Sequence, residues 1–129
     1  MIILDEHLPP TQRHLLRSWH IAVRQIGYDV GRQGLQDEDI IPFLLLHRRP
    51  TFVTLDAGFY DRTLCHARYS LAYLSVRQNE VANFVRRLLR HPEFDTQAKR
   101  SGSVLRLSHV GISAWRLRHQ RETHHAWNQ

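Results

Sequence analysis

Four aspartates in the first half of the chain stand where an apolar run ends or a helix is expected to begin. They are Asp5, Asp37, Asp39 and Asp56. Asp5 follows the apolar run at residues 2–4, and Asp56 follows the run at 51–55. If these runs are neighbouring strands of a parallel sheet, their acids meet at one edge of it. Carboxylates gathered there repel one another unless a cation neutralises them, and oxygen ligands favour Mg²⁺ or Mn²⁺.

A metal ion held by carboxylates suits the hydrolysis of phosphodiesters. The spacing therefore predicts that Asp5, Asp37 and Asp56 are metal ligands. Asp39 is the next candidate for a catalytic acid. Three of the acids also have plainer interpretations. Asp37 fits a helix N-cap, Asp39 fits a partner of a helix dipole, and Asp56 fits a residue that binds loop amides at a turn.

The elements that would position these acids alternate between short apolar runs and helical patterns. Such alternation predicts an α/β fold with a mostly parallel sheet covered on both faces. We expect strands at 2–4, 28–30, 51–55, 70–76, 104–107 and 112–117, helices at 11–26, 38–48 and 78–91, and a polar loop at 93–102. At 129 residues the chain is one domain, predicted over 1–118, with a polar and frayed tail at 119–129.

Four segments, taken in order, resemble the PIN-like ribonuclease family, in particular its small bacterial branch allied to VapC-type toxins. The segments are ILDEHLP at 3–9, GYDV at 27–30, GLQDEDI at 34–40 and TLDAGF at 54–59. The resemblance covers residues 1–90. It implies a three-layer α/β/α fold and a divalent-metal-dependent endoribonuclease in a toxin–antitoxin pair. It also implies that Asp5, Asp37 or Asp39, and Asp56 hold the metal, and that a small antitoxin protein blocks the cleft.

The chain departs from the family pattern at Gly58, where the family often carries a second aspartate. One acid of the usual quartet is therefore missing unless Asp61 or Glu6 replaces it. The departure leaves two alternatives to a full two-metal enzyme, a single-metal site and a weakened enzyme.

Basic charge gathers in the second half of the chain. The net charge is +6, and residues 62–129 carry twelve basic and four acidic residues, a net charge of +8. All basic residues but Lys99 are arginine, whose planar fork suits phosphate. A solvated basic face is the plainer alternative. The arginines predicted to hold an RNA backbone are Arg86, Arg87, Arg90, Arg100 and Arg106. The candidate stacking partners are Tyr60, Tyr69 and Trp115, and packing in the core is the plainer interpretation of Trp115.

The leading hypothesis is therefore a PIN-like endoribonuclease that acts on RNA. The first alternative is a catalytically weakened module that binds RNA or an antitoxin, and the second is a DNA-processing nuclease of the same fold. The apolar stripe of the 78–91 helix is expected to be core, with a homodimer contact as the lesser alternative. The single Cys65 excludes an internal disulfide and a cysteine-rich zinc site, and we expect a cytoplasmic protein without a membrane span.

Overall fold

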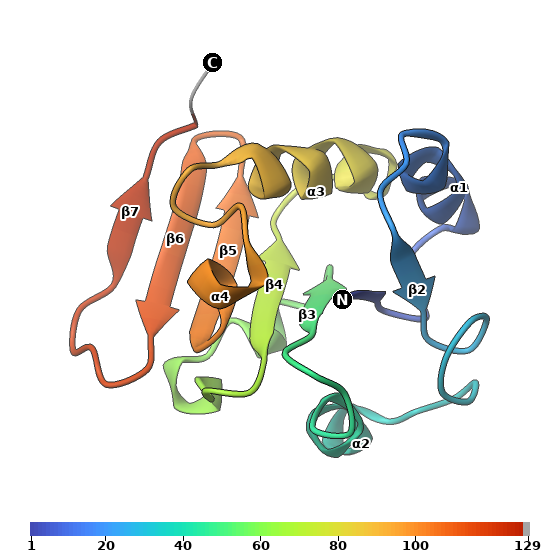
Figure 1. Ribbon diagram of the computed structural model, residues 1–129, viewed down its shortest axis with the longest axis horizontal. Helices are drawn as coiled ribbons and strands as arrows, with labels where there is room; N and C mark the ends of the chain where they lie inside the picture. The colour runs from blue at the N-terminus through green and yellow to red at the C-terminus, as the bar shows by residue number, and fades with distance from the viewer. Residues whose placement is uncertain (128–129) are drawn as a thin grey trace.

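A seven-stranded sheet forms the centre of the computed structural model, which describes residues 1–127 (Figure 1). The strand order is β2-β1-β3-β4-β5-β6-β7. The first five strands in that order are parallel, and β6 and β7 are antiparallel additions. The strands are β1 Ile2–Leu4, β2 Val23–Gln25, β3 Thr51–Thr54, β4 Ser70–Leu74, β5 Ser103–Ser108, β6 Gly111–Arg116 and β7 Thr123–His125. The prediction of an α/β fold with a mostly parallel sheet is confirmed.

Helices cover both faces of this sheet, so its central strands β1 and β3 are buried at every position. Alternate residues of a strand point to opposite faces. Leu4 and Val53 pack with α1 and α3 in one core cluster, and Ile3 and Phe52 pack with α2 in the other. The helices are α1 Pro10–Ser18, α2 Asp37–Leu44, α3 Val81–Arg90 and α4 Gln97–Arg100, with 3₁₀ turns η1 Ala57–Phe59, η2 Arg62–Leu64 and η3 Gln78–Glu80. No helix within residues 1–127 is long and apolar enough to cross a membrane.

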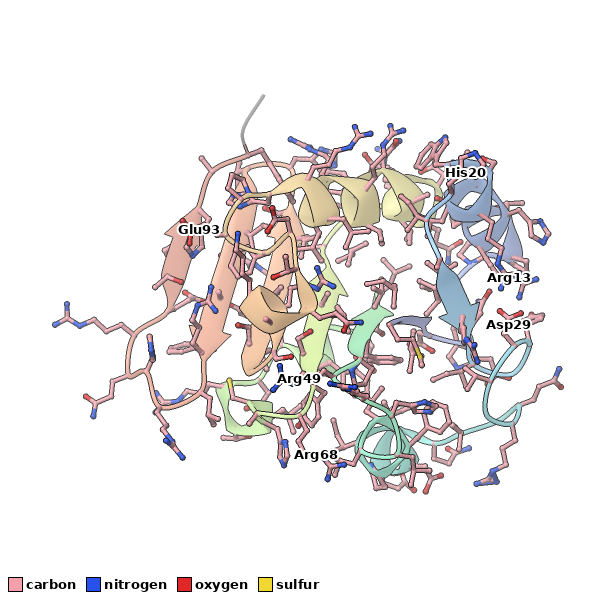
Figure 2. All side chains as sticks on the ribbon, viewed as in Figure 1. Arg13, His20, Asp29, Arg49, Arg68 and Glu93 are labelled. Carbon is pink, nitrogen blue, oxygen red and sulfur yellow. The ribbon has the colours of Figure 1, made fainter. Side chains whose placement is uncertain are left out.

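The first helix is shorter than predicted, because it stops at Ser18 rather than near residue 26. His20 takes a left-handed backbone conformation with φ of 61° (labelled in Figure 2). The N–H of His20 then donates to the carbonyl of Arg17, and the N–H of Ile21 donates to that of Leu16. This is the Schellman ending that glycine usually supplies. The chain therefore turns early, and the second strand forms at 23–25 instead of 28–30.

The end of the chain was predicted to be a frayed tail, and for residues 123–127 that prediction is wrong. The strand β7 pairs with β6 in antiparallel register. Trp127 then donates its indole N–H to the carbonyl of Ser108 at 2.7 Å, and a ring nitrogen of buried His91 lies 2.9 Å from the carbonyl of Ala126. These two hydrogen bonds could not be predicted from the polar composition of the tail, since each depends on a single side chain that meets a residue elsewhere in the chain.

Gly111 is required where β6 starts, and its replacement by alanine is expected to release β7. A Cβ at Gly111 would lie 2.3 Å from the carbonyl oxygen of His125, closer than any real contact. We expect Gly111→Ala to lower the free energy of unfolding by about 2 kcal/mol. The tryptophan emission should shift to the red as Trp127 leaves its site. Gly34→Ala is the control, because Gly34 also has a positive φ of 80° but open space around it. Equal effects of the two variants would contradict the prediction.

Candidate active site

The acids predicted to hold a metal lie on both sides of the topological switch point of the sheet. At this point the connections of neighbouring strands run in opposite directions. From β1 the chain steps one way to β2 and then crosses to the other side of β1 to form β3. In open α/β sheets, ligands bind beyond the carboxyl ends of the strands at such a switch point. Asp5 directly follows β1, and Asp56 lies two residues beyond the end of β3. The condition for their convergence, that the two strands are neighbours, therefore holds.

One buried hydroxyl connects the two acids. Thr54, the last residue of β3, donates its hydroxyl to Asp5 Oδ2 at 2.7 Å and accepts the N–H of Asp56 at 3.0 Å. The other carboxylate oxygen of Asp5 accepts the N–H of His7 at 3.3 Å. Thr54 is fully buried, so water does not compete for its hydroxyl. The sequence interpretation missed Thr54, because its role depends on the register between β1 and β3.

Asp56 is exposed, and it also has the structural role that the plainer interpretation assigned to it. Its carboxylate accepts the N–H of Gly58 at 2.8 Å and begins the 3₁₀ turn η1. A Cβ placed at Gly58 would lie 3.1 Å from the same Asp56 oxygen. A side chain at position 58 would therefore crowd Asp56, and glycine keeps that oxygen accessible.

A pocket of about 440 Å³ brings Asp37 to the same place as Asp56. The pocket is lined by Asp37, Glu38, Ile41, Asp56, Gly58, Phe59, Asp61 and Leu64. Asp37 is the first residue of α2 rather than its N-cap, which is Gln36, so its carboxylate is not occupied in capping. Four carboxylates from two segments thus share one pocket, as expected of a site for cations.

Two other acids, Asp39 and Glu6, form structural contacts of their own, so they are not candidate metal ligands. Asp39 accepts the N–H of Gln36 at 3.2 Å in a capping arrangement and lies 3.8 Å from Arg32. Glu6 accepts the N–H of Gly34 through both of its oxygens, at 2.9 and 3.1 Å, so it does not replace the acid missing at position 58. Asp39 therefore matches its plainer interpretation, since it stabilises the start of α2.

The acids do not form a closed metal cage. Within residues 1–127, no three His, Cys, Asp or Glu side chains are placed to hold one ion together. Mg²⁺ rarely needs such a cage, because it usually keeps several waters and binds one or two carboxylates together with the phosphates of a substrate. The oxygen donors of Asp5 and Asp56 beside an open pocket fit that incomplete kind of site.

Arg100 was predicted to bind RNA, and the structure contradicts this. Its side chain is only 3% exposed, although it lies in the segment predicted to be a polar loop. The guanidinium donates to the Thr51 hydroxyl at 2.9 Å and to the carbonyl of Phe94 at 2.8 Å. Burial also lowers the pKa of this guanidinium. Arg100 thus joins the short helix α4 to the start of β3 and cannot present its charge to a phosphate.

The other four predicted arginines reach the surface, in two places. Arg86 and Arg87 lie on α3 and stack on indole rings, Arg86 at 3.7 Å from Trp19 and Arg87 at 4.4 Å from Trp127. Arg90 is exposed at the end of the same helix. Arg106 is exposed on β5. Stacking on tryptophan holds a guanidinium in place while leaving its N–H groups available.

Among the stacking candidates, Tyr69 is buried, whereas Tyr60 lies beside Arg106. Tyr60 donates its hydroxyl to the carboxylate of Glu122, in the segment before β7. Burial first, and this carboxylate second, raise the pKa of Tyr60 far above its usual range, because both disfavour the phenolate. Tyr60 thus stays protonated under all ordinary conditions.

Replacing Glu122 by glutamine is expected to lower the pKa of Tyr60 while leaving it above the ordinary value. The variant removes the negative charge, and the burial that is the larger cause remains. An ultraviolet absorbance titration measures the phenolate step, and Tyr60→Phe assigns it. Glu93→Gln is the control for a lost surface charge. An unchanged titration in Glu122→Gln would show that the carboxylate does not act on Tyr60.

Comparisons of the chain with models of known families, with curated proteins and with solved structures find no match. The resemblance to PIN-like ribonucleases therefore stays a prediction that rests on the four sequence segments.

Proposed function

We propose that the protein is a metal-dependent endoribonuclease with a PIN-like, three-layer α/β/α fold, the toxin of a toxin–antitoxin pair. The observation that carries the proposal is the position of Asp5 and Asp56 beyond the carboxyl ends of two neighbouring central strands. This is the switch point at which open α/β sheets bind ligands. The hydroxyl of Thr54 that joins the two residues adds support, since an acid held in one orientation suits a defined ligand.

In this proposal Asp5 and Asp56 hold Mg²⁺ or Mn²⁺, with Asp37 contributing from the pocket that it lines together with Asp56. The bound metal would supply an activated water and offset charge on the leaving oxygen. Thr54 fixes the orientation of the Asp5 carboxylate. Arg106 and the arginines of α3 hold the RNA backbone, and an antitoxin would inhibit by filling the acidic pocket.

Cleavage of a mixed pool of single-stranded RNA by the purified protein tests this function. We expect cutting with Mg²⁺ or Mn²⁺ and none with EDTA, because the proposed mechanism relies on the metal to activate the attacking water. Cutting that persists in EDTA would contradict the metal role. Preferential cutting of DNA would instead favour a DNA nuclease.

A second candidate is a module that binds RNA or an antitoxin without cleaving. Within residues 1–127 no three His, Cys, Asp or Glu side chains are placed to hold one ion, and this, together with Gly58, favours the second candidate. It predicts no cutting with any metal and RNA binding that weakens steeply with salt, since phosphate contacts release counterions.

A further inference from the structure

A second pocket lies beside the acidic one, at the ends of β3 and β4. Its volume is about 540 Å³, and it is lined by Leu55, Tyr73, Leu74, Ser75, Val76, Arg77, Glu80 and His109. The two pockets are close neighbours, because Leu55 stands between Thr54 and Asp56 in the chain. The lining comes from the ends of β3 and β4, the turn η3 and the β5–β6 turn. Polar groups from several elements that converge in one hollow are typical of a binding site.

The side chains of Arg77 and His109 in this pocket are available to a ligand. The guanidinium of Arg77 is exposed and has no hydrogen-bond or ion-pair partner within residues 1–127. Beside it, Nε2 of His109 lies 3.1 Å from the Glu80 carboxylate, and the ring packs edge-on against Phe84. Nδ1 of His109 has no partner in the described part of the chain. The imidazole is thus held in place with one nitrogen free.

The Glu80 carboxylate holds the backbone of Arg77 and the ring of His109 in place. It accepts the N–H of Arg77 at 3.0 Å as well as contacting His109. The hydrogen bond from the Arg77 backbone is the main cause that lowers the pKa of Glu80, and His109 adds to it. The guanidinium of Arg77 therefore remains available to bind an anion.

We propose that Arg77 and His109 bind a phosphate of single-stranded RNA next to the phosphate that is cleaved, with Tyr73 against the adjoining nucleotide. The inference rests on the proposed function, because it makes the acidic pocket the neighbouring site of cleavage. An acidic and a basic pocket on either side of Leu55 suit a polyanion that meets a metal at one phosphate and a guanidinium at the next. A half-buried tyrosine in the lining of this pocket suits contact with a nucleotide.

Binding is tested apart from cleavage by using the Asp5→Asn protein in EDTA. The probe is a fluorescein-labelled 12-nucleotide single-stranded RNA, and fluorescence anisotropy gives its Kd. Adding Arg77→Gln and His109→Gln is expected to weaken binding by about tenfold at 0.1 M salt. The dependence of log K on log salt should become shallower by about 0.7 for each lost phosphate contact.

The matched control adds Arg48→Gln and His119→Gln, which change an exposed arginine and an exposed histidine outside both pockets. An equal loss of affinity in the control would overturn the site. Arg77→Gln alone carries the same test if the double change alters the unfolding temperature, because the Arg77 side chain makes no contact that the fold needs. It should then give a smaller loss, and no loss would overturn the site.

The two proposals fail in different ways. If the wild-type protein cleaves RNA but the Arg77 and His109 changes leave Kd as in the control, the phosphate site is wrong and the nuclease stands. If no metal supports cleavage but binding still depends on Arg77 and His109, the nuclease is wrong and the site stands.

Discussion

Asp5→Asn is expected to reduce metal-dependent RNA cleavage by at least about a thousandfold, which corresponds to about 4 kcal/mol of transition-state stabilisation. The change removes one of the two charges at the switch point, and a neutral amide is a poor ligand for Mg²⁺. The fold should be unaffected, because the amide oxygen of asparagine can still accept the Thr54 hydroxyl that now binds Asp5 Oδ2. We therefore expect the free energy of unfolding to change by less than about 1 kcal/mol.

The measurement is the initial rate of cleavage of single-stranded RNA at saturating Mg²⁺, with urea unfolding of the same samples. Asp95→Asn is the matched control, since Asp95 makes only an exposed pair with Lys99 at 2.9 Å. Its cleavage rate should stay within about twofold of the wild-type rate. A rate for Asp5→Asn within tenfold of the wild-type rate would remove Asp5 from the metal site.

Arg100→Met is expected to lower the free energy of unfolding by about 3 kcal/mol and the unfolding temperature by about 10 °C. The replacement keeps most of the side-chain volume but removes the donors to Thr51 and to the carbonyl of Phe94. Thr51 keeps its 2.7 Å contact with the Ser70 hydroxyl, whereas no other donor to the Phe94 carbonyl is found within residues 1–127. An unsatisfied buried carbonyl accounts for much of the expected loss.

Arg90→Met serves as the control, and the opposite pattern is expected for it, with little change in stability and weaker RNA binding. Arg90 is exposed at the end of α3, so its loss should change the free energy of unfolding by less than about 1 kcal/mol. We expect it to weaken RNA binding, whereas Arg100→Met should leave RNA binding unchanged at temperatures where the variant is folded. Thermal unfolding and fluorescence anisotropy measure the two effects. Weakened RNA binding by folded Arg100→Met would restore Arg100 to the RNA-binding set.

The parts of the fold that the sequence predicted well are those decided by local pattern. The runs at 2–4 and 51–55 are mainly apolar, with threonine at 51 and 54, because helices cover both faces of the sheet, and a short apolar run is typical of such a strand. The helix at 78–91 has one apolar stripe and was found within three residues of its bounds. The second strand was misplaced because His20, an unusual residue for a left-handed ending, stops the first helix.

The acids of the candidate site could be predicted from the sequence, whereas the roles of the residues around them could not. Asp5 and Asp56 could be chosen because both follow apolar runs, and the carboxyl ends of parallel strands share an edge. Thr54 and Arg100 could not be assigned, since their roles depend on residues far away in the chain. Thr54 meets Asp5 across 49 positions, and Arg100 meets Thr51 across 49 as well. From composition alone, an arginine is expected to carry its charge at the surface. Only the tertiary structure shows that a particular arginine is buried.

The central place of β1 has a consequence for how the protein is made. Residues 2–4 pair with 23–25 and with 51–53, so the middle of the sheet cannot close until the ribosome has released the chain beyond β3. The antiparallel pairs β5–β6 and β6–β7, in contrast, join near neighbours in the chain and can form quickly. Asp5 and Thr54 therefore meet only when the slow, long-range part of folding is complete. In the proposed function, a nascent or truncated chain would carry all its early acids and still be harmless to the cell that synthesises it.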